Sequence, residues 1–101
     1  MASSTEYLEF VLDLLRDVPA VTHKKMMGEY LLYSDEALFG GIYDDRFLLK
    51  DTPAARKAFP QLEVPYEGAK PMALVDIEDP AAIAGVIAAM LAELPSPKKK
   101  H

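Results

Sequence analysis

The chain has 101 residues, a mass of 11.2 kDa and a formal net charge of −5, and half of its residues are hydrophobic. This length suits one compact domain, and the composition excludes wholesale disorder, collagen and coiled-coil rods. The absence of cysteine excludes disulfides, thiolate metal sites and iron–sulfur clusters. No apolar run approaches the roughly 20 residues that cross a bilayer, and no secretory signal is evident. We therefore expect a cytoplasmic protein without membrane contact.

Positive charge gathers at the C-terminus, in Lys98, Lys99 and Lys100. Without these three residues, eight basic side chains face sixteen acidic ones, so residues 1–97 carry a net charge of −8. Nucleic-acid binding draws most of its affinity from neutralised phosphates, so this acidic body argues against a nucleic-acid partner. We expect a folded domain over residues 1–95 and a disordered, solvated Pro/Lys tail over residues 96–101.

The first predicted helix begins near Ser3 and Glu6, which have the spacing of a capping box. Apolar residues then recur at helical spacing as far as Val18, and Pro19 ends the helix. The opposite face is acidic, which does not suit a membrane surface. This helix is expected to pack on a core.

Residues 20–28 are interpreted as a connection. Three antiparallel strands with polar turns between them are expected next: residues 29–33, 38–43 and 46–50. Asp44 and Asp45 form the second turn, because Asp tolerates the left-handed backbone that two-residue hairpin turns require. Two later strands are predicted over residues 62–66 and 72–77, the first of them at a sheet edge because Pro65 has no backbone N–H.

Two more helices have clear start signals. Thr52-Pro53 and Asp79-Pro80 each combine a capping side chain with proline at the first helical position. The first of these helices is short, and the second runs to about Leu94. The predicted order is helix, three strands, helix, two strands, helix, which is an α+β fold of two layers with a mainly antiparallel sheet.

Two features of the strand region have both a chemical and a structural interpretation. His23, Lys24 and Lys25 are a possible anion-binding cluster, but they equally suit a surface loop, and too few other histidines exist to complete a metal site. Arg46 is the fourth predicted ligand or partner contact, although it is also expected to pair with a nearby acid, one of Asp44, Asp45 and Glu29.

Gly40-Gly41 lies inside a predicted strand, where glycine usually marks a bulge or the close approach of another backbone or a ligand. A phosphate cradle would require these glycines to open into a helix. They run into Ile42-Tyr43 instead, so we expect a bulge or tight packing here.

Two segments of this region resemble a known family. The segments Lys-Met-Met-Gly-Glu-Tyr-Leu-Leu-Tyr at 25–33 and Leu-Phe-Gly-Gly-Ile-Tyr-Asp-Asp-Arg-Phe-Leu-Leu-Lys at 38–50 resemble the N-terminal domain of the TfoX/Sxy competence regulators. Pro65-Tyr66 and Lys70-Pro71-Met72 fall where that family has a "Tyr…Lys-Pro-Met" segment. The resemblance extends over nearly the whole chain.

The resemblance implies a secretion-chaperone-like α+β fold with the element order given above. Bacterial members that also carry a second, helical domain regulate competence for DNA uptake, and this sequence looks like a stand-alone member without that domain. The family supplies no catalytic residue and no cofactor to transfer. The matched residues are implied to be a structural signature: Gly28, Gly40, Gly41, Asp44, Asp45 and Arg46.

The leading functional hypothesis is a non-enzymatic regulatory or protein-interaction domain. It would act as a homodimer or with another protein partner, through a sheet edge or an apolar face, and would use no catalytic residue, metal or cofactor. The alternative is a domain that binds a small ligand or nucleic acid through the His23–Lys25 region, Arg46 and the lysine tail.

Overall fold

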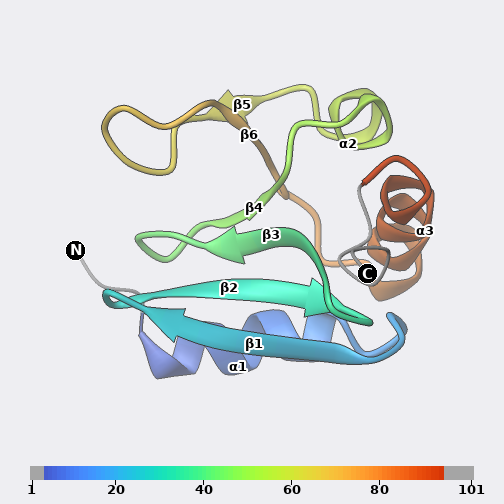
Figure 1. The fold of residues 1–101 in the computed structure, drawn as a ribbon. Coiled ribbons are helices and arrows are strands. Elements are labelled where there is room, and N and C mark those ends of the chain that lie inside the picture. The colour runs from blue at the N-terminus through green and yellow to red at the C-terminus, as the bar shows by residue number, and fades with distance from the viewer. Residues whose placement is uncertain (1–3, 95–101) are drawn as a thin grey trace, which may run out of the picture.

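The computed structural model describes residues 4–94, so the predicted Pro/Lys tail lies outside the described residues. It contains three helices and one six-stranded antiparallel sheet (Figure 1), which confirms the α+β class. In chain order the elements are α1 (Thr5–Leu14), β1 (Val21–Met26), β2 (Glu29–Ser34), β3 (Ala37–Ile42), β4 (Phe47–Leu49), α2 (Pro53–Ala58), β5 (Leu62–Glu63), β6 (Met72–Leu74) and α3 (Pro80–Leu91). None of the helices within residues 4–94 is long and apolar enough to span a membrane.

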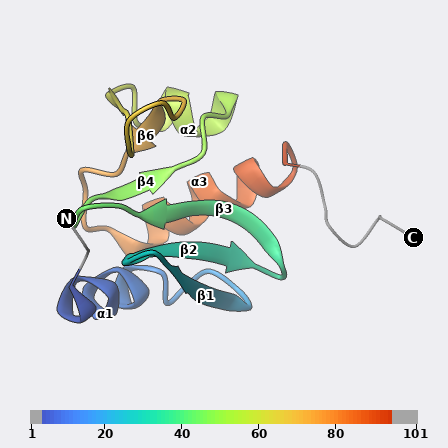
Figure 2. The same cartoon turned by 60° about the vertical axis from the view of Figure 1, so that its left-hand side comes forward.

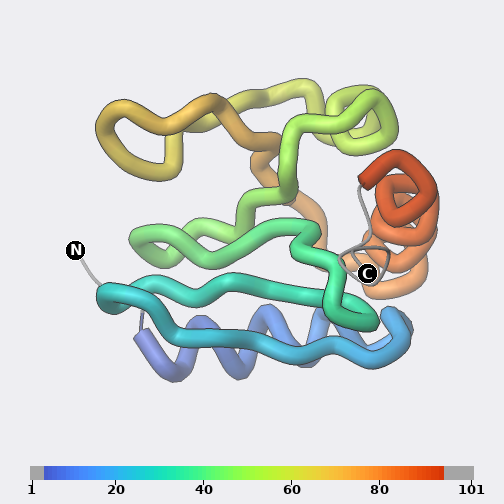
Figure 3. Tube along the Cα trace, viewed as in Figure 1, coloured from blue at the N-terminus to red at the C-terminus, as the bar shows by residue number. Residues whose placement is uncertain are grey.

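The strands lie in the order β1-β2-β3-β4-β6-β5, so β6 is inserted between β4 and β5. Figure 3 shows the consequence for the chain path: the segment between β5 and β6 returns beside the tip of the β3–β4 hairpin. β5 and β1 are the two edges of the sheet. The prediction that the strand over residues 62–66 lies at an edge is confirmed, but this strand, β5, ends at Glu63, before Pro65.

One hydrophobic core joins all three helices to one face of the sheet. The strand register places on this face a set of buried side chains from four strands: Tyr30, Leu32, Ile42, Phe47, Leu49 and Ala73. Residues of α1, α2 and α3 complete the same core, and Figure 2 shows the helices grouped around the strands. The opposite face is called the open face, and its side chains include Lys24, Met26, Leu31, Tyr43, Leu48 and Lys50.

Three two-residue hairpin turns connect β1 to β4. The central residues of each turn have positive φ angles, as a type I′ turn requires. These pairs are Met27-Gly28, Asp35-Glu36 and Asp44-Asp45. The predicted turn at Asp44-Asp45 is confirmed, and Gly28, with φ of 86°, occupies a position that favours glycine.

The interpretation of residues 20–28 as a connection is wrong, because Val21–Met26 forms β1 and pairs with β2 along its whole length. The sheet therefore has six strands instead of five. β1 is an edge strand whose residues from Thr22 onward are exposed on both faces. A strand without a buried face lacks the apolar alternation by which strands are recognised in a sequence.

The helix starts follow the predicted caps, with one shift, whereas α1 ends at Leu14 and α3 at Leu91, before the predicted ends near Val18 and Leu94. Ser4, and not Ser3, caps α1, since its Oγ accepts a hydrogen bond of 3.1 Å from the backbone N–H of Tyr7. Ser3 lies outside the described residues. Thr52 and Asp79 cap α2 and α3 as predicted, each accepting backbone N–H bonds in the first turn.

The glycine pair does mark a bulge with close backbone approach. Leu32 pairs with Gly40 and Tyr33 pairs with Leu38, so Phe39 is an extra residue in β3. A Cβ on Gly40 would overlap the carbonyl oxygen of Leu48 in β4. The expectation of a bulge or tight packing is confirmed.

Candidate binding site on the open face

The structure separates the four residues predicted to contact a ligand. His23 and Lys25 point to the helix side of β1, where the His23 ring lies edge-on to Tyr30 with 6.0 Å between ring centroids. Lys24 points to the open face. Arg46 follows the β3–β4 turn, so β2 and β3 lie between it and β1. A site that uses His23, Lys24 and Lys25 stays a prediction, and Arg46 is not brought to it.

Arg46 instead ties the β3–β4 hairpin to the segment that follows β5. Its Nη1 forms a salt bridge of 3.0 Å with Glu63 Oε1, and its Nη2 donates to the carbonyl oxygen of Pro65 at 3.2 Å. Its Nε donates to the carbonyl oxygen of Tyr43 at 3.1 Å. The expected pairing with Asp44, Asp45 or Glu29 is therefore corrected to Glu63.

Two acids near the Asp44-Asp45 turn accept hydrogen bonds from backbone N–H groups. The N–H of Ser4 donates to Asp45 Oδ1 at 2.9 Å, and the N–H of Asp44 donates to Glu29 Oε1 at 3.0 Å. These bonds hold the turn to the start of α1 and to β2. Asp45 and Glu29 thus accept bonds from backbone N–H groups, while Arg46 pairs with Glu63.

We expect Arg46→Met to lower the free energy of unfolding by about 1–3 kcal/mol, because it removes the salt bridge with Glu63 and leaves the carbonyls of Tyr43 and Pro65 without their donor. Chemical denaturation of the wild type and the variant measures this difference. The matched control is Arg16→Met, whose salt bridge with Asp13 is largely exposed and lies within one helical turn; this variant should lose less than about 1 kcal/mol. Equal losses in the two variants would contradict the anchoring role of Arg46.

The stability that the Arg46–Glu63 salt bridge contributes depends on pH. The hydrogen bond from Gln61 and then that from Arg46 lower the pKa of the Glu63 carboxyl below its ordinary value. A lowered folded-state pKa adds stability above the unfolded-state pKa, and this stability is lost as the pH falls through the folded-state pKa. The stability difference between the wild type and Arg46→Met should therefore narrow under acid conditions.

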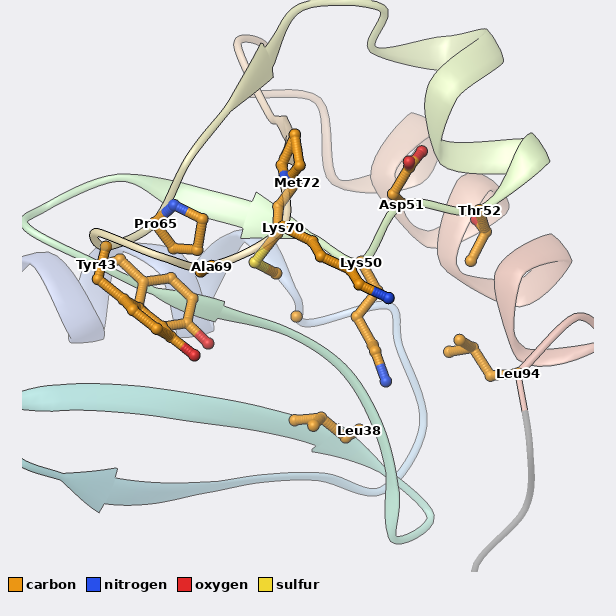
Figure 4. Close-up of a pocket in the computed structure, with 13 residues that line it drawn as sticks. Leu38, Tyr43, Lys50, Asp51, Thr52, Pro65, Ala69, Lys70, Met72 and Leu94 are labelled. Carbon is orange, nitrogen blue, oxygen red and sulfur yellow. The ribbon is translucent and has the colours of Figure 1, made fainter.

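A pocket of about 320 Å³ lies on the open face between β3, the end of β4 and the segment before β6 (Figure 4). Arg46 holds one wall of this pocket in place, because its guanidinium donates a hydrogen bond to the carbonyl of Pro65, which lines the pocket. The wall is mainly apolar and aromatic: Leu38, Tyr43, Pro65, Tyr66, Pro71, Met72 and Leu94. Its charged members are Lys50, Lys70 and Asp51.

The pocket carries an excess of positive charge. Neither Lys50 nor Lys70 forms a salt bridge among the described residues 4–94. The carboxylate of Asp51 accepts from two nitrogens of the Arg56 guanidinium, so its charge is already compensated. Figure 4 shows the two lysine side chains extending toward the same end of the pocket as Leu38 and Leu94. Two ammonium groups are thus available there to an anion.

Tyr43 and Tyr66 link this pocket to a second hollow. Their ring centroids are 6.1 Å apart, and both residues line each hollow. Burial, followed by the electrostatic interaction with Tyr66, raises the pKa of the Tyr43 phenol above its ordinary value. The second hollow, of about 490 Å³, is otherwise lined by Met26, Met27, Glu29 and Leu31.

Large apolar side chains are exposed around the second hollow. Met27, at the tip of the β1–β2 hairpin, is 94% exposed, and Tyr66 is 61% exposed. Met26 is about half exposed. We call these three residues, which all line the second hollow, the apolar patch: Met26, Met27 and Tyr66. Contiguous exposed apolar residues of this kind are typical of interaction sites.

Sequence reasoning missed the lysine pocket. Lys50 and Lys70 are twenty residues apart and share no periodic pattern, and they meet because β6 pairs with β4. One signal was available: Lys50, Pro65-Tyr66 and Lys70-Pro71-Met72 all belong to the segments that carried the family resemblance, and all line this pocket. Within residues 4–94, no group of three or more His, Asp or Glu side chains is placed to hold a metal ion.

Comparison with known proteins agrees with this fold. A 12.7 kDa protein from the trpE 5′ region of Spirochaeta aurantia, described as uncharacterized, is 36% identical over 104 residues, which cover 99% of this chain and 90% of that protein. No solved structure shows significant similarity to the chain. The pattern that defines the TfoX N-terminal domain matches residues 13–77, from within α1 to just after β6. The chain therefore belongs to the TfoX N-terminal domain family.

Proposed function

We propose that this protein is a non-enzymatic, cytoplasmic regulatory domain that works by protein–protein interaction and forms a homodimer through its open face. The observation that carries the proposal is the apolar patch, which lies on the sheet face opposite the helices. The regulatory role is the one that the resemblance to competence regulators implies. No catalytic step is assigned.

The sheet edges are less suited to self-association than the open face. β1 presents Lys24 and Lys25 along its edge, and an antiparallel pairing of two copies centred on these residues would bring like charges together. β5 at the other edge has only two residues and is followed closely by Pro65, which has no N–H to donate. Both edges thus have features that discourage strand pairing.

The open face, in contrast, has the features of a self-complementary surface. A two-fold interface places the same surface on both sides, so it needs apolar contact area and charges of both signs. The hollows of the open face provide the apolar area, and their lining includes Lys50 and Lys70 as well as Glu29. These features support a face-to-face dimer with the apolar patch at its centre.

Light scattering over a range of protein concentrations tests the proposal. The wild type should reach twice its mass of 11.2 kDa, and the double variant Met27→Asn/Tyr66→Ser should stay monomeric, since it removes the two most exposed apolar side chains of the patch. Asn suits the positive φ of position 27, so the turn should be retained.

The control is Phe10→Ser, which removes an apolar side chain that is 41% exposed on α1, outside the open face. This variant should dimerise like the wild type. A wild type that remains monomeric, or a Phe10→Ser variant that alone loses the dimer, would contradict the proposed interface.

A further inference from the structure

We infer that the pocket between Lys50 and Lys70 binds a small organic anion that combines a planar ring with a carboxylate or phosphate group. This binding follows from the charge, lining and construction of the pocket and does not require the protein to be a dimer. It therefore goes beyond the proposed function.

The charge of the pocket suits an anion. The chain as a whole is acidic, with a net charge of −5, yet this pocket brings together two lysines that have no salt-bridge partner among residues 4–94. The one acid in the lining, Asp51, is bound by Arg56. An anion placed here would receive two charge-assisted hydrogen bonds without displacing an existing ion pair.

The size and the remaining lining of the pocket suit a ring. The volume of about 320 Å³ lies at the lower end of the range for small-molecule sites, so it fits a single ring with one or two substituents. Tyr43 and Tyr66 supply aromatic surface, and Met72 and Leu94 supply aliphatic surface. An apolar lining with a few charged groups at one end is the usual arrangement for an amphipathic ligand.

The wall of the pocket is held in place before any ligand arrives. Arg46 bonds the carbonyls of Tyr43 and Pro65, both of which line the pocket, and Glu63 fixes the guanidinium. A preorganised wall reduces the ordering cost of binding. Arg46 is thus a positioning residue for this pocket, and the ligand is expected to contact the lysines.

The test is an NMR titration of the amide signals of the full chain, at low salt, with three probes: benzoate, phenyl phosphate and inorganic phosphate. We expect benzoate and phenyl phosphate to shift the amides of Lys50, Lys70 and Tyr66, and inorganic phosphate to bind at least about tenfold more weakly because it lacks the ring. The relative affinities of the first two probes distinguish a carboxylate ligand from a phosphate ligand.

Each of Lys50→Gln and Lys70→Gln should weaken binding of the better probe by about tenfold, the loss of one charge-assisted hydrogen bond. The matched control is Lys57→Gln, an exposed lysine of α2 that does not line the pocket, and it should bind like the wild type. Tyr66→Ser should weaken the two ring-bearing probes and leave inorganic phosphate unchanged. Amide spectra of each free variant establish that it is folded.

The inference is overturned if none of the probes shifts the pocket amides up to about 10 mM. It is equally overturned if Lys57→Gln weakens binding as much as the pocket variants do, because the effect would then be one of overall charge. Light scattering on the same samples separates the two proposals: a monomer that binds benzoate supports the pocket and contradicts the dimer.

Discussion

Replacing Gly40 with alanine is expected to lower the free energy of unfolding by about 3 kcal/mol, the upper end of the usual cost of overpacking. The added Cβ would overlap the carbonyl oxygen of Leu48 and approach the Leu49 Cα to 3.1 Å. These neighbours are backbone atoms of the adjacent strand, so they cannot rotate away as a side chain would. The strand pair β3–β4 would have to separate locally.

Urea denaturation of Gly40→Ala and Gly85→Ala measures this effect against a matched control. Gly85 lies in α3, and a Cβ added there would meet no neighbouring element within 4 Å, so alanine should raise stability by about 1 kcal/mol through its higher helix propensity. A loss of stability in Gly40→Ala together with a gain in Gly85→Ala would confirm that the close approach of the strands, and not the loss of a glycine as such, causes the destabilisation. A Gly40→Ala variant as stable as the wild type would contradict the strand geometry.

Phe39→Ala is expected to have an even larger effect, a loss of about 3–5 kcal/mol. Phe39 is the extra residue of the β3 bulge, and its side chain is completely buried in the core that joins the helices to the sheet. Removing the ring would leave a cavity in a small domain whose total stability is expected to be only about 5–15 kcal/mol. The variant should unfold at a much lower temperature or denaturant concentration.

The control for Phe39→Ala is Phe10→Ala, the same substitution at a side chain that is 41% exposed on α1. Phe10→Ala should lower the free energy of unfolding by much less than Phe39→Ala, because much of the removed surface already contacts solvent. Similar losses at the two positions would place Phe39 outside the core and would contradict the assigned bulge.

The sequence predicted the parts of the fold that depend on local signals. The caps Thr52 and Asp79, with proline at the next position, set the starts of α2 and α3, and the Asp44-Asp45 pair set a turn. Each of these signals acts over a few residues, so it can be interpreted without knowing the rest of the fold. The first strand, β1, could not be recognised because both of its faces are exposed.

The candidate site depends on contacts that no local signal contains. Arg46 pairs with Glu63, seventeen residues away, although Asp44 and Asp45 directly precede it in the sequence. Lys50 and Lys70 line one pocket because β6 is inserted between β4 and β5. Strand order is set by the packing of the whole domain, so these pairings require the three-dimensional structure.

The open face is proposed as the interaction surface of this domain, and assigned amide spectra of the wild type test that role most directly. The spectra are recorded from dilute to concentrated solution. We expect concentration-dependent shifts at the apolar patch, around Met26, Met27 and Tyr66, with α1 and α3 unchanged. Shifts confined to α3 or to α1, or no shifts at any concentration, would contradict this role.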